Sequence, residues 1–253
     1  MARHIEAWMD GVALSTVGPF IISGVEESVP ETAVYSTDKP GIPGQRVSSR
    51  LRRELRVTLR VAIRELYDLS RRAYAAENLA AWASGAVLQL SNRPERQLRV
   101  QLDRAPALGD VRDYTQELRV EFVAVSPPYW ENHLPTQLTL TGSDTSGTIT
   151  VPGTVPTPLR ITATPGSAIT GLTVTAGGKS IELDDMSIPV SQAVTFDRDS
   201  RDDLRMLSGG VSLTRYRTTA SADDLMVGPG IVTVAVEASA SCSWLVEVYG
   251  RWA

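Results

Sequence analysis

The sequence predicts a mainly β protein with one helix, built as an N-terminal α+β domain followed by a C-terminal β-sandwich. Three observations lead to this class. Several segments of the first half alternate apolar and polar residues with a period of two, one segment has helical spacing, and the composition changes sharply after Trp130. A period of two places every second side chain on one face of a sheet, so the alternating segments are expected to be half-buried strands.

The first half holds three clear alternating segments. Residues 55–63 alternate leucine, valine and isoleucine with polar or small residues, and the pattern recurs at residues 98–102 and 118–124. Between the first two segments, apolar residues recur at steps of three and four, at Leu66, Leu69, Ala73, Ala76, Ala80 and Ala83. This spacing predicts one helix, and Gly85 stands where a C-cap glycine is expected. We therefore expect residues 1–131 to form antiparallel strands with one helix packed on them.

Residues 29–49 interrupt this pattern. They have no sustained period and contain Pro30, Pro40, Gly41, Pro43 and Gly44. Such a composition predicts a long loop or a protruding hairpin, and long loops in compact domains are usually functional or disordered. A dense series of arginines follows, between residues 46 and 64.

The second half has a different composition. From Thr136 onward, threonine, serine, glycine, valine and isoleucine dominate. Short strand candidates alternate with turns, at residues 137–141, 148–151, 159–164, 172–176, 180–183, 193–196, 211–217, 231–236 and 243–249. Many short strands with Gly/Pro turns are typical of a β-sandwich. Because Pro127 and Pro128 stop the last strand of the first half, we expect domains at residues 1–132 and 133–253.

The composition argues against several classes of function. The chain of 253 residues has a net charge of -4, which gives the whole chain no electrostatic basis for binding nucleic acid or an anionic membrane. No stretch approaches the roughly 20 apolar residues that a membrane span needs. Charged residues interrupt the N-terminus, so we expect no secretion signal and a product that stays in the cytoplasm or leaves it by another route.

The sequence contains no convincing catalytic or metal-binding pattern. Cys242 is the only cysteine, and a small core residue is its favoured role over a catalytic dyad with His4 or His133. Gly177–Ser180 resembles a phosphate loop but joins two strands, so we expect a hairpin turn. The acidic segment Asp197–Asp203 lacks the glycine of an EF-hand loop and contains two arginines, which favours a solvated loop over a calcium site. We expect no cofactor and no enzymatic activity.

Several short motifs occur in an order that is found in a known family. The first half contains Trp8, Asp10 and Gly11 on an opening strand, then Gly24–Val25, Gly44–Arg46 and Pro128–Trp130. The second half contains Gly147–Val151, Pro158–Ile161, Gly177–Leu183 and Gly228–Gly230. Together these motifs resemble the distal tail protein (Dit) family of siphophages, except that Pro127 replaces the acidic residue usual before Pro-Tyr-Trp. The resemblance implies a ring-forming belt domain at residues 1–132 and a galectin-like sandwich at residues 133–253.

The resemblance also implies a function, that of a structural protein of the virion. Members of the family form a ring of six copies that connects the tube of a long non-contractile tail to the tail-tip (tail-associated) protein and to receptor-binding proteins. DNA would only pass through the ring, and no membrane is involved. The protein, made in the cytoplasm of the bacterial host, would end in the tail tip. The alternative is a carbohydrate-binding adhesion module of a tail-like particle, because galectin-like folds can bind sugar. Aromatic candidates for such a site are Tyr216, Tyr249 and Trp252, whereas Trp244 is expected in the core.

The arginine series is the candidate interface. Alternation with apolar residues places Arg46, Arg52, Arg56 and Arg60 on an exposed strand face. Nucleic-acid phosphates would suit such a series, but Glu54 interrupts it and few aromatic residues are interleaved for stacking on bases. We therefore assign these four arginines to solvent or to the interface between neighbouring copies in a ring, where they would meet acidic groups.

Overall fold

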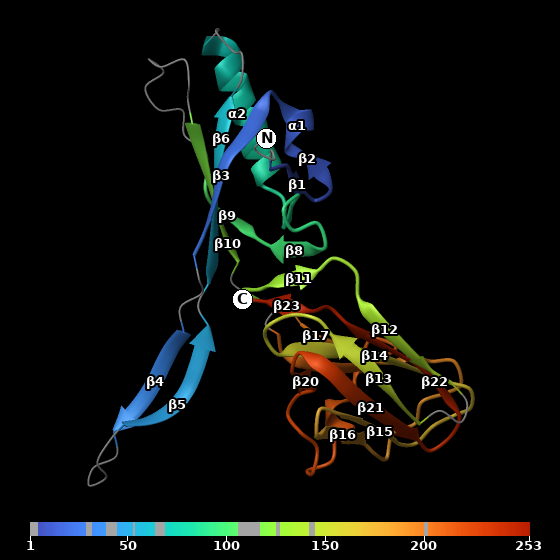
Figure 1. Cartoon of the computed structure of the whole chain (residues 1–253). Helices are drawn as coiled ribbons and strands as arrows, with labels where there is room; N and C mark the ends of the chain where they lie inside the picture. The colour runs from blue at the N-terminus through green and yellow to red at the C-terminus, as the bar shows by residue number, and fades with distance from the viewer. Residues whose placement is uncertain are drawn as a thin grey trace. The chain divides into compact units, whose positions relative to one another are not determined.

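The chain forms two compact units, Met1–Trp130 with Ala253 and Glu131–Trp252 (Figure 1). The computed structural model describes residues 5–28, 32–38, 45–52, 54–63, 69–105, 117–124, 127–141, 145–199 and 202–253. Most elements in these ranges are β-strands, so the predicted mainly β class is confirmed. The described residues contain two α-helices, α1 (Leu14–Val17) and α2 (Leu69–Ala83), where the sequence predicted one.

The central sheet of the first unit has the strand order β3-β6-β10-β9, and its neighbouring strands are antiparallel. Its strands are β3 (Phe20–Glu27), β6 (Leu55–Ile63), β9 (Gln101–Arg104) and β10 (Glu117–Ala124). Val57, Leu59 and Val61 of β6 are fully buried, as the period of two predicted. The intervening residues point to the other side, so the sheet has one apolar face and one charged face.

A second sheet of the first unit runs in the order β2-β1-β7-β8. Its strands are β1 (Ala7–Met9), β2 (Val12–Ala13), β7 (Val87–Leu90) and β8 (Arg96–Arg99). Asp10 and Gly11 connect β1 to β2 with φ of 50° and 81°, the left-handed conformation for which Asp-Gly is favoured in two-residue hairpins. The Asp10 carboxylate also accepts hydrogen bonds from the backbone N–H groups of Ala86 at 3.0 Å and Val87 at 2.9 Å.

The sequence predicted one strand at residues 98–102, and this prediction is wrong. These residues are divided between the end of β8 and the start of β9, which belong to different sheets. Val100 lies between them, and its backbone N–H donates to the carbonyl of Ala86 at 2.8 Å. Leu98 and Val100 are both buried, so the alternation continues through the change of sheet and hides the boundary.

Helix α2 confirms the predicted helix from Leu69 onward with two corrections, and Leu66 of the predicted face lies outside the described residues. The centre of its buried face is Leu79, which is 0% exposed, with Trp82 beside it, whereas Ala80 is only half-buried. The Trp82 indole N–H donates to the carbonyl of Val12 at 2.8 Å, which ties the helix to β2. Gly85 does not adopt a left-handed φ; a Cβ there would lie 2.4 Å from the Met9 side chain, so glycine permits a close approach. No helix among the described residues has the length and apolarity needed to cross a membrane.

Residues 29–49, predicted to form a long loop or a protruding hairpin, include most of a hairpin. Strands β4 (Thr32–Asp38) and β5 (Gln45–Arg52) pair antiparallel as a separate sheet, with an irregularity between Tyr35 and Ser36. Residues 29–31 and 39–44 of the expected segment lie outside the described residues.

The second unit is a sandwich of two antiparallel sheets, as predicted. One sheet has the order β12-β22-β14-β17-β18-β19 with β20 paired to β14, and the other has the order β13-β21-β15-β16. The strands of the first are β12 (Thr136–Leu140), β14 (Thr157–Pro165), β17 (Val194–Arg198), β18 (Leu204–Ser208), β19 (Val211–Ser212), β20 (Met226–Val227) and β22 (Cys242–Val248). Those of the second are β13 (Ser146–Val151), β15 (Leu172–Ala176), β16 (Lys179–Leu183) and β21 (Gly230–Ala238).

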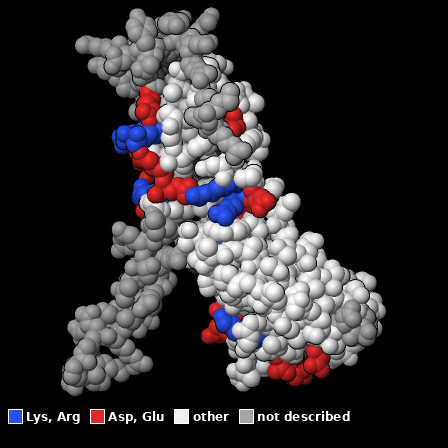
Figure 2. All heavy atoms as spheres, in the orientation of Figure 1, with Lys and Arg blue, Asp and Glu red and all other residues white. Residues whose placement is uncertain are grey.

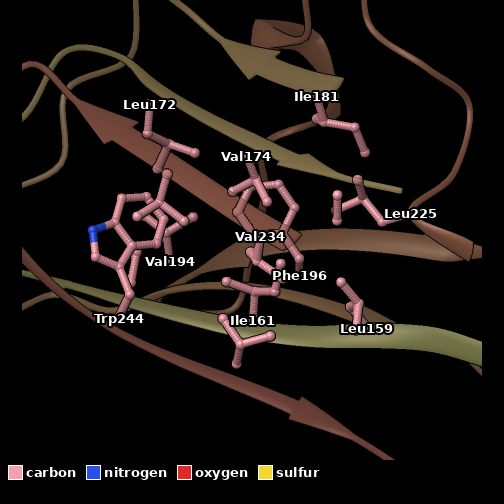
Figure 3. Close-up of a cluster of buried hydrophobic side chains, with 14 of the residues drawn as sticks. Leu159, Ile161, Leu172, Val174, Ile181, Val194, Phe196, Leu225, Val234 and Trp244 are labelled. Atoms are coloured by element: carbon pink, nitrogen blue, oxygen red, sulfur yellow. The ribbon is translucent and has the colours of Figure 1, made fainter. Parts of the chain in front are cut away.

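The inward faces of the two sheets form one apolar core (Figure 3). Ile161 and Phe196 of one sheet and Val174 and Val234 of the other are 0% exposed. Trp244 is 4% exposed in the same cluster, which confirms its predicted place in the core. Alternating burial along each strand lets this half bury its own apolar surface, which is what an independent core requires.

Some boundaries in the sandwich differ from the prediction. The expected strand at residues 211–217 is wrong, because β19 ends at Ser212 and a 3-10 turn follows at Thr214–Tyr216. The sequence did not predict β18, β20, or two short strands near the chain junction and the C-terminus, β11 (Trp130–Asn132) and β23 (Arg251–Trp252). Gly177 and Gly178, with φ of 56° and 78°, form the predicted hairpin turn between β15 and β16.

Candidate assembly interface

The exposed side of the central sheet carries a set of ion-paired residues, here named the charged face: Glu26, Glu54, Arg56, Arg60, Asp103 and Glu117. Arg60 on β6 forms an ion pair with Glu26 on β3, and its Nε lies 3.6 Å from Glu117 Oε1 on β10. Ser23 Oγ lies 3.2 Å from the Arg60 carbonyl oxygen and 3.3 Å from Glu117 Oε1, and its single proton can be donated to either acceptor. One arginine on the middle strand thus links carboxylates on both neighbouring strands.

Arg56, near the start of β6, pairs with Glu54 just before its own strand and with Asp103 on β9, which lies beyond β10 in the sheet. Its Nη1 lies 2.5 Å from Asp103 Oδ2 on β9, and its Nε and Nη2 donate to Glu54 Oε1 at 2.9 and 2.6 Å. The hydrogen bonds to Glu54 and Asp103 raise the pKa of Arg56 above its already high ordinary value. The guanidinium therefore carries its charge at any physiological pH while its side chain stays 49% exposed.

The arginine series is divided between two strands of different sheets. Arg56 and Arg60 share the charged face, as the period of two predicted. Arg46 and Arg52 lie in β5, where the backbone register places them opposite Thr37 and Thr32 of β4. The sequence placed all four on one strand face, and that expectation is wrong because the chain passes from the hairpin into the central sheet after Arg52.

The electrostatics of the charged face suit a protein partner. Among the residues that Figure 2 colours in the first unit, acidic and basic side chains lie next to one another. A phosphate backbone would compete with carboxylates that already hold Arg56 and Arg60. A protein surface of mixed charge can instead exchange partners with both signs, which gives specificity to association.

Trp130 anchors the end of the first unit. It is 2% exposed, and its indole N–H donates to Glu27 Oε2 at 3.3 Å. Arg93 Nη1 donates to the same oxygen at 2.8 Å, and the Arg93 guanidinium carbon lies 5.0 Å from the centroid of the indole ring. The last residue of the Pro-Pro-Tyr-Trp motif is therefore held by packing, a hydrogen bond and a cation–π contact.

Arg251 is the buried charge of the second unit. It is 3% exposed and forms paired hydrogen bonds with Asp202 at 2.7 and 2.8 Å, while its Nε donates to Glu131 at 2.8 Å. Burial alone would lower its pKa, but the bonds to Asp202 and the charge of Glu131 outweigh burial, and the pKa is raised. Sequence reasoning missed this cluster because its members lie far apart in the chain and follow no local motif.

The acidic segment at Asp197–Asp203 is not simply solvated. The Asp202 carboxylate is held by Arg251, and Asp197 Oδ2 lies 3.3 Å from Arg160 Nε. Within the described ranges, no group of three or more acidic, histidine or cysteine side chains is placed to hold a metal ion. Cys242 is buried in the sandwich core as predicted, and burial raises the pKa of its thiol, which disfavours the nucleophilic thiolate.

A shallow groove of about 510 Å³ lies on the exposed face of the β13-β21-β15-β16 sheet of the sandwich. Hydroxyl groups and one carboxylate line it, from Thr145, Ser146, Thr173, Thr175 and Glu237, with the small Ala235 beside them. No aromatic residue lines this groove, and Trp244 is in the core. The groove offers hydrogen bonds but no stacking surface, so it gives the carbohydrate-binding alternative little support.

Comparison with known proteins identifies the fold. No family model matches the sequence, and no curated protein matches it. The crystal structure of the Dit protein (gp 19.1) of phage SPP1, described as a paradigm of the hub adsorption apparatus in phages that infect Gram-positive bacteria, is similar with a TM-score of 0.73 and 13% identity over 99% of this chain and 100% of that chain. A chain of the phage p2 baseplate in its activated conformation with strontium is similar with a TM-score of 0.51 and 8% identity over 98% of each chain.

Each of these similarities covers both units. At such low identity they establish the fold, and the fold is the one that the ordered motifs of the sequence indicated. The chain has the fold of a phage Dit hub protein over nearly its whole length.

Proposed function

We propose that the chain is a structural, non-enzymatic subunit of a phage tail tip. The observation that carries this proposal is the nearly full-length fold match to a Dit hub protein, together with the similar fold of a baseplate chain. A fold alone does not fix a function, and a sandwich by itself would be weak support. Two different units in the same order over 99% of the chain are a more specific feature than either unit alone.

The proposed assembly is a ring of six copies. It would join the tail tube protein to the tail-tip protein and carry receptor-binding proteins, with DNA passing through the opening. Head-to-tail contacts close into a ring when the rotation between neighbours fits a closed symmetry. The protein would be made in the cytoplasm of the bacterial host and reside at the tail tip of the virion.

The charged face and the β4–β5 hairpin are the proposed ring contacts. Arg56 and Arg60 hold a mixed-charge surface that a neighbouring copy can meet. Arg46 and Arg52 on β5 lie in a hairpin that is a sheet of its own, and we assign them to the same contact. Carboxylates of the neighbour would pair with Arg46 and Arg52 and would exchange with the present partners of Arg56 and Arg60.

A division of labour between the halves is part of the proposal. Residues 1–132 would suffice for the ring, and residues 133–253 would fold alone and dock peripheral tip proteins. Separate apolar cores in the two units support this division. Two chains truncated at this boundary test it: rings formed by the full chain but not by soluble residues 1–132 would refute the division.

Immunogold labelling of purified phage particles tests the location. Antibody against the chain should label the end of the tail that is distal to the head. Labelling of the capsid, labelling along the tail tube, or absence of the chain from particles would contradict the proposed function. Mass spectrometry of the same particles separates a true absence from an epitope that is covered.

A further inference from the structure

Strand β13 is an edge strand of its sheet, and it lacks the features that usually protect an edge strand from pairing with another chain. It pairs on one side with β21 in an uninterrupted register from Ser146 to Val151 (Figure 1). Natural outer strands are commonly protected by charged residues, proline, a bulge or a covering segment, because free backbone groups recruit other chains. The six residues of β13 include no charge and no proline, and their register contains no bulge.

The register fixes which backbone groups of β13 point outward. Thr145 lies opposite Val236, and its carbonyl accepts the Val236 N–H at 2.7 Å. Because backbone direction alternates along a strand, Gly147 and Ile149 also direct their groups toward β21. The N–H and C=O groups of Ser146, Thr148 and Thr150 consequently point away from the sheet, and no hydrogen bond to them occurs among the described residues.

The opposite end of the same sheet is protected. The outward groups of β16 are covered by the segment that follows the 3-10 turn. The N–H of Thr218 donates to the Glu182 carbonyl at 3.0 Å, and the N–H of Ala222 donates to the Ser180 carbonyl at 2.7 Å. The outward backbone groups of edge strand β16 are thus hydrogen-bonded within the chain, whereas those of edge strand β13 have no such partner among the described residues.

The surroundings of β13 indicate the chemistry of a partner strand. On the exposed face, the groove described above extends from Ser146 across Ala235 to Glu237. No ion pair involves Glu237 in the described part of the chain. On the inner side, Gly147 has no side chain, and Leu138 and Leu140 lie within 3.2 Å of the position of its missing Cβ. A strand beside β13 would therefore find a carboxylate and hydroxyl groups on one side and leucine side chains on the other.

We propose that β13 accepts an extended strand from a different tail-tip protein, with an apolar residue facing Leu138 and a basic residue lying across Ser146 toward Glu237. The backbone groups of Ser146, Thr148 and Thr150 would give affinity, and the two side-chain sites would give specificity. A second copy of β13 is a poorer occupant, because it supplies no cation for Glu237. The proposal rests on the proposed function for the assembly in which the partner occurs.

Amide hydrogen exchange tests the added strand directly. The probe is the full chain, measured in isolation and in tail tips purified from phage particles. The amides of Ser146, Thr148 and Thr150 should exchange at least about tenfold more slowly in the tip than in the isolated chain. Presence of the chain in the tip with unchanged exchange would overturn the proposal and leave the proposed function intact. Absence of the chain from tips would overturn both.

Substitutions on β13 distinguish an added strand from other protection. Thr148→Pro removes one outward N–H without removing a bond to β21, and outer strands tolerate proline. It should abolish the slowed exchange at Thr150 in the tip, whereas the matched variant Thr148→Val, which keeps the N–H, should preserve it. Glu237→Gln should reduce the protection by a smaller factor. If Thr148→Pro fails to fold, as judged by its thermal transition, Thr150→Lys serves as the second edge-blocking variant. Equal protection in all variants, or protection of the isolated chain that tracks dimer formation in sedimentation, would refute the proposal.

Discussion

The charged face of the first unit and the Arg251 cluster of the second use charged residues in opposite ways. In the first unit, Arg56 and Arg60 form ion pairs with side chains that are 38–53% exposed. In the sandwich, Arg251 forms its ion pairs at a side-chain exposure of 4%. Exposed pairs cost little to break and can be exchanged for pairs with another molecule. A buried charge must keep its partners, because leaving one partner alone in the interior is costly.

This difference separates the proposed assembly surface from a structural anchor. In the proposed ring, a neighbouring copy would rearrange the ion pairs of the charged face without unfolding the sheet. The Arg251 cluster instead fixes Glu131, the first residue of the second unit, while Trp130 is fixed within the first unit. Two consecutive residues are thus each anchored in their own unit.

The largest expected effect comes from breaking the buried cluster. Arg251→Met leaves Asp202 and Glu131 without their cation, and it should lower the free energy of unfolding of the sandwich by about 3–5 kcal/mol. The matched control is Arg160→Met, because Arg160 pairs with Asp197 in the same sandwich with side chains that are 46% and 43% exposed. That control should change stability by less than about 1 kcal/mol. Denaturant titration of the full chain measures both, and equal losses would contradict this account of the cluster.

A smaller loss is expected at the Trp130 anchor. Trp130→Phe keeps most of the buried ring but removes the indole N–H that donates to Glu27. We expect a loss of about 1–2 kcal/mol in the stability of the first unit. Combining it with Glu27→Gln in a double-mutant cycle should give a total loss smaller than the sum of the single losses. Strict additivity would show that the hydrogen bond contributes nothing.

Reversing a charge on the charged face should affect assembly far more than folding. Arg60→Glu loses exposed ion pairs, so stability should fall by less than about 1 kcal/mol. Ring formation, measured by negative-stain electron microscopy and sedimentation, should be lost because like charges then meet at the contact. The control is Arg160→Glu in the sandwich, whose ion pair with Asp197 is similarly exposed. Rings of Arg60→Glu as abundant as those of the unaltered chain would remove the charged face from the interface.

The smallest effect concerns Asp224. Burial by itself would raise its pKa, but hydrogen bonds from Lys179 at 2.5 Å and the Met226 N–H at 2.9 Å outweigh burial and lower it. A carboxyl whose pKa is lowered by folding contributes stability above its unfolded pKa and loses it as pH falls through the lower folded pKa. Denaturation between pH 5 and pH 2 should show a loss below about 1 kcal/mol, because the pair is about 40% exposed. Asp224→Asn should remove that part of the pH dependence.

Local physics explains what the sequence could predict. Alternation identified β6, β10, β14 and β15 because each buries every second residue on one face. The Gly177–Gly178 hairpin was also predictable, because glycine favours the positive φ that a two-residue turn requires. Long-range partners had no local signal, so the Arg251 cluster and the anchoring of Trp130 by Glu27 and Arg93 were missed. The arginine series was assigned to one face because periodicity does not reveal where a chain changes sheets.

Electron cryomicroscopy of the intact tail tip tests the central claim most directly. The account predicts a closed ring of six copies of this chain, with the charged face and the β4–β5 hairpin between neighbouring copies. It also predicts an opening wide enough for duplex DNA along the tail axis. A well-resolved reconstruction in which the chain is absent from the tip, or is present without forming a closed ring of six, would contradict it.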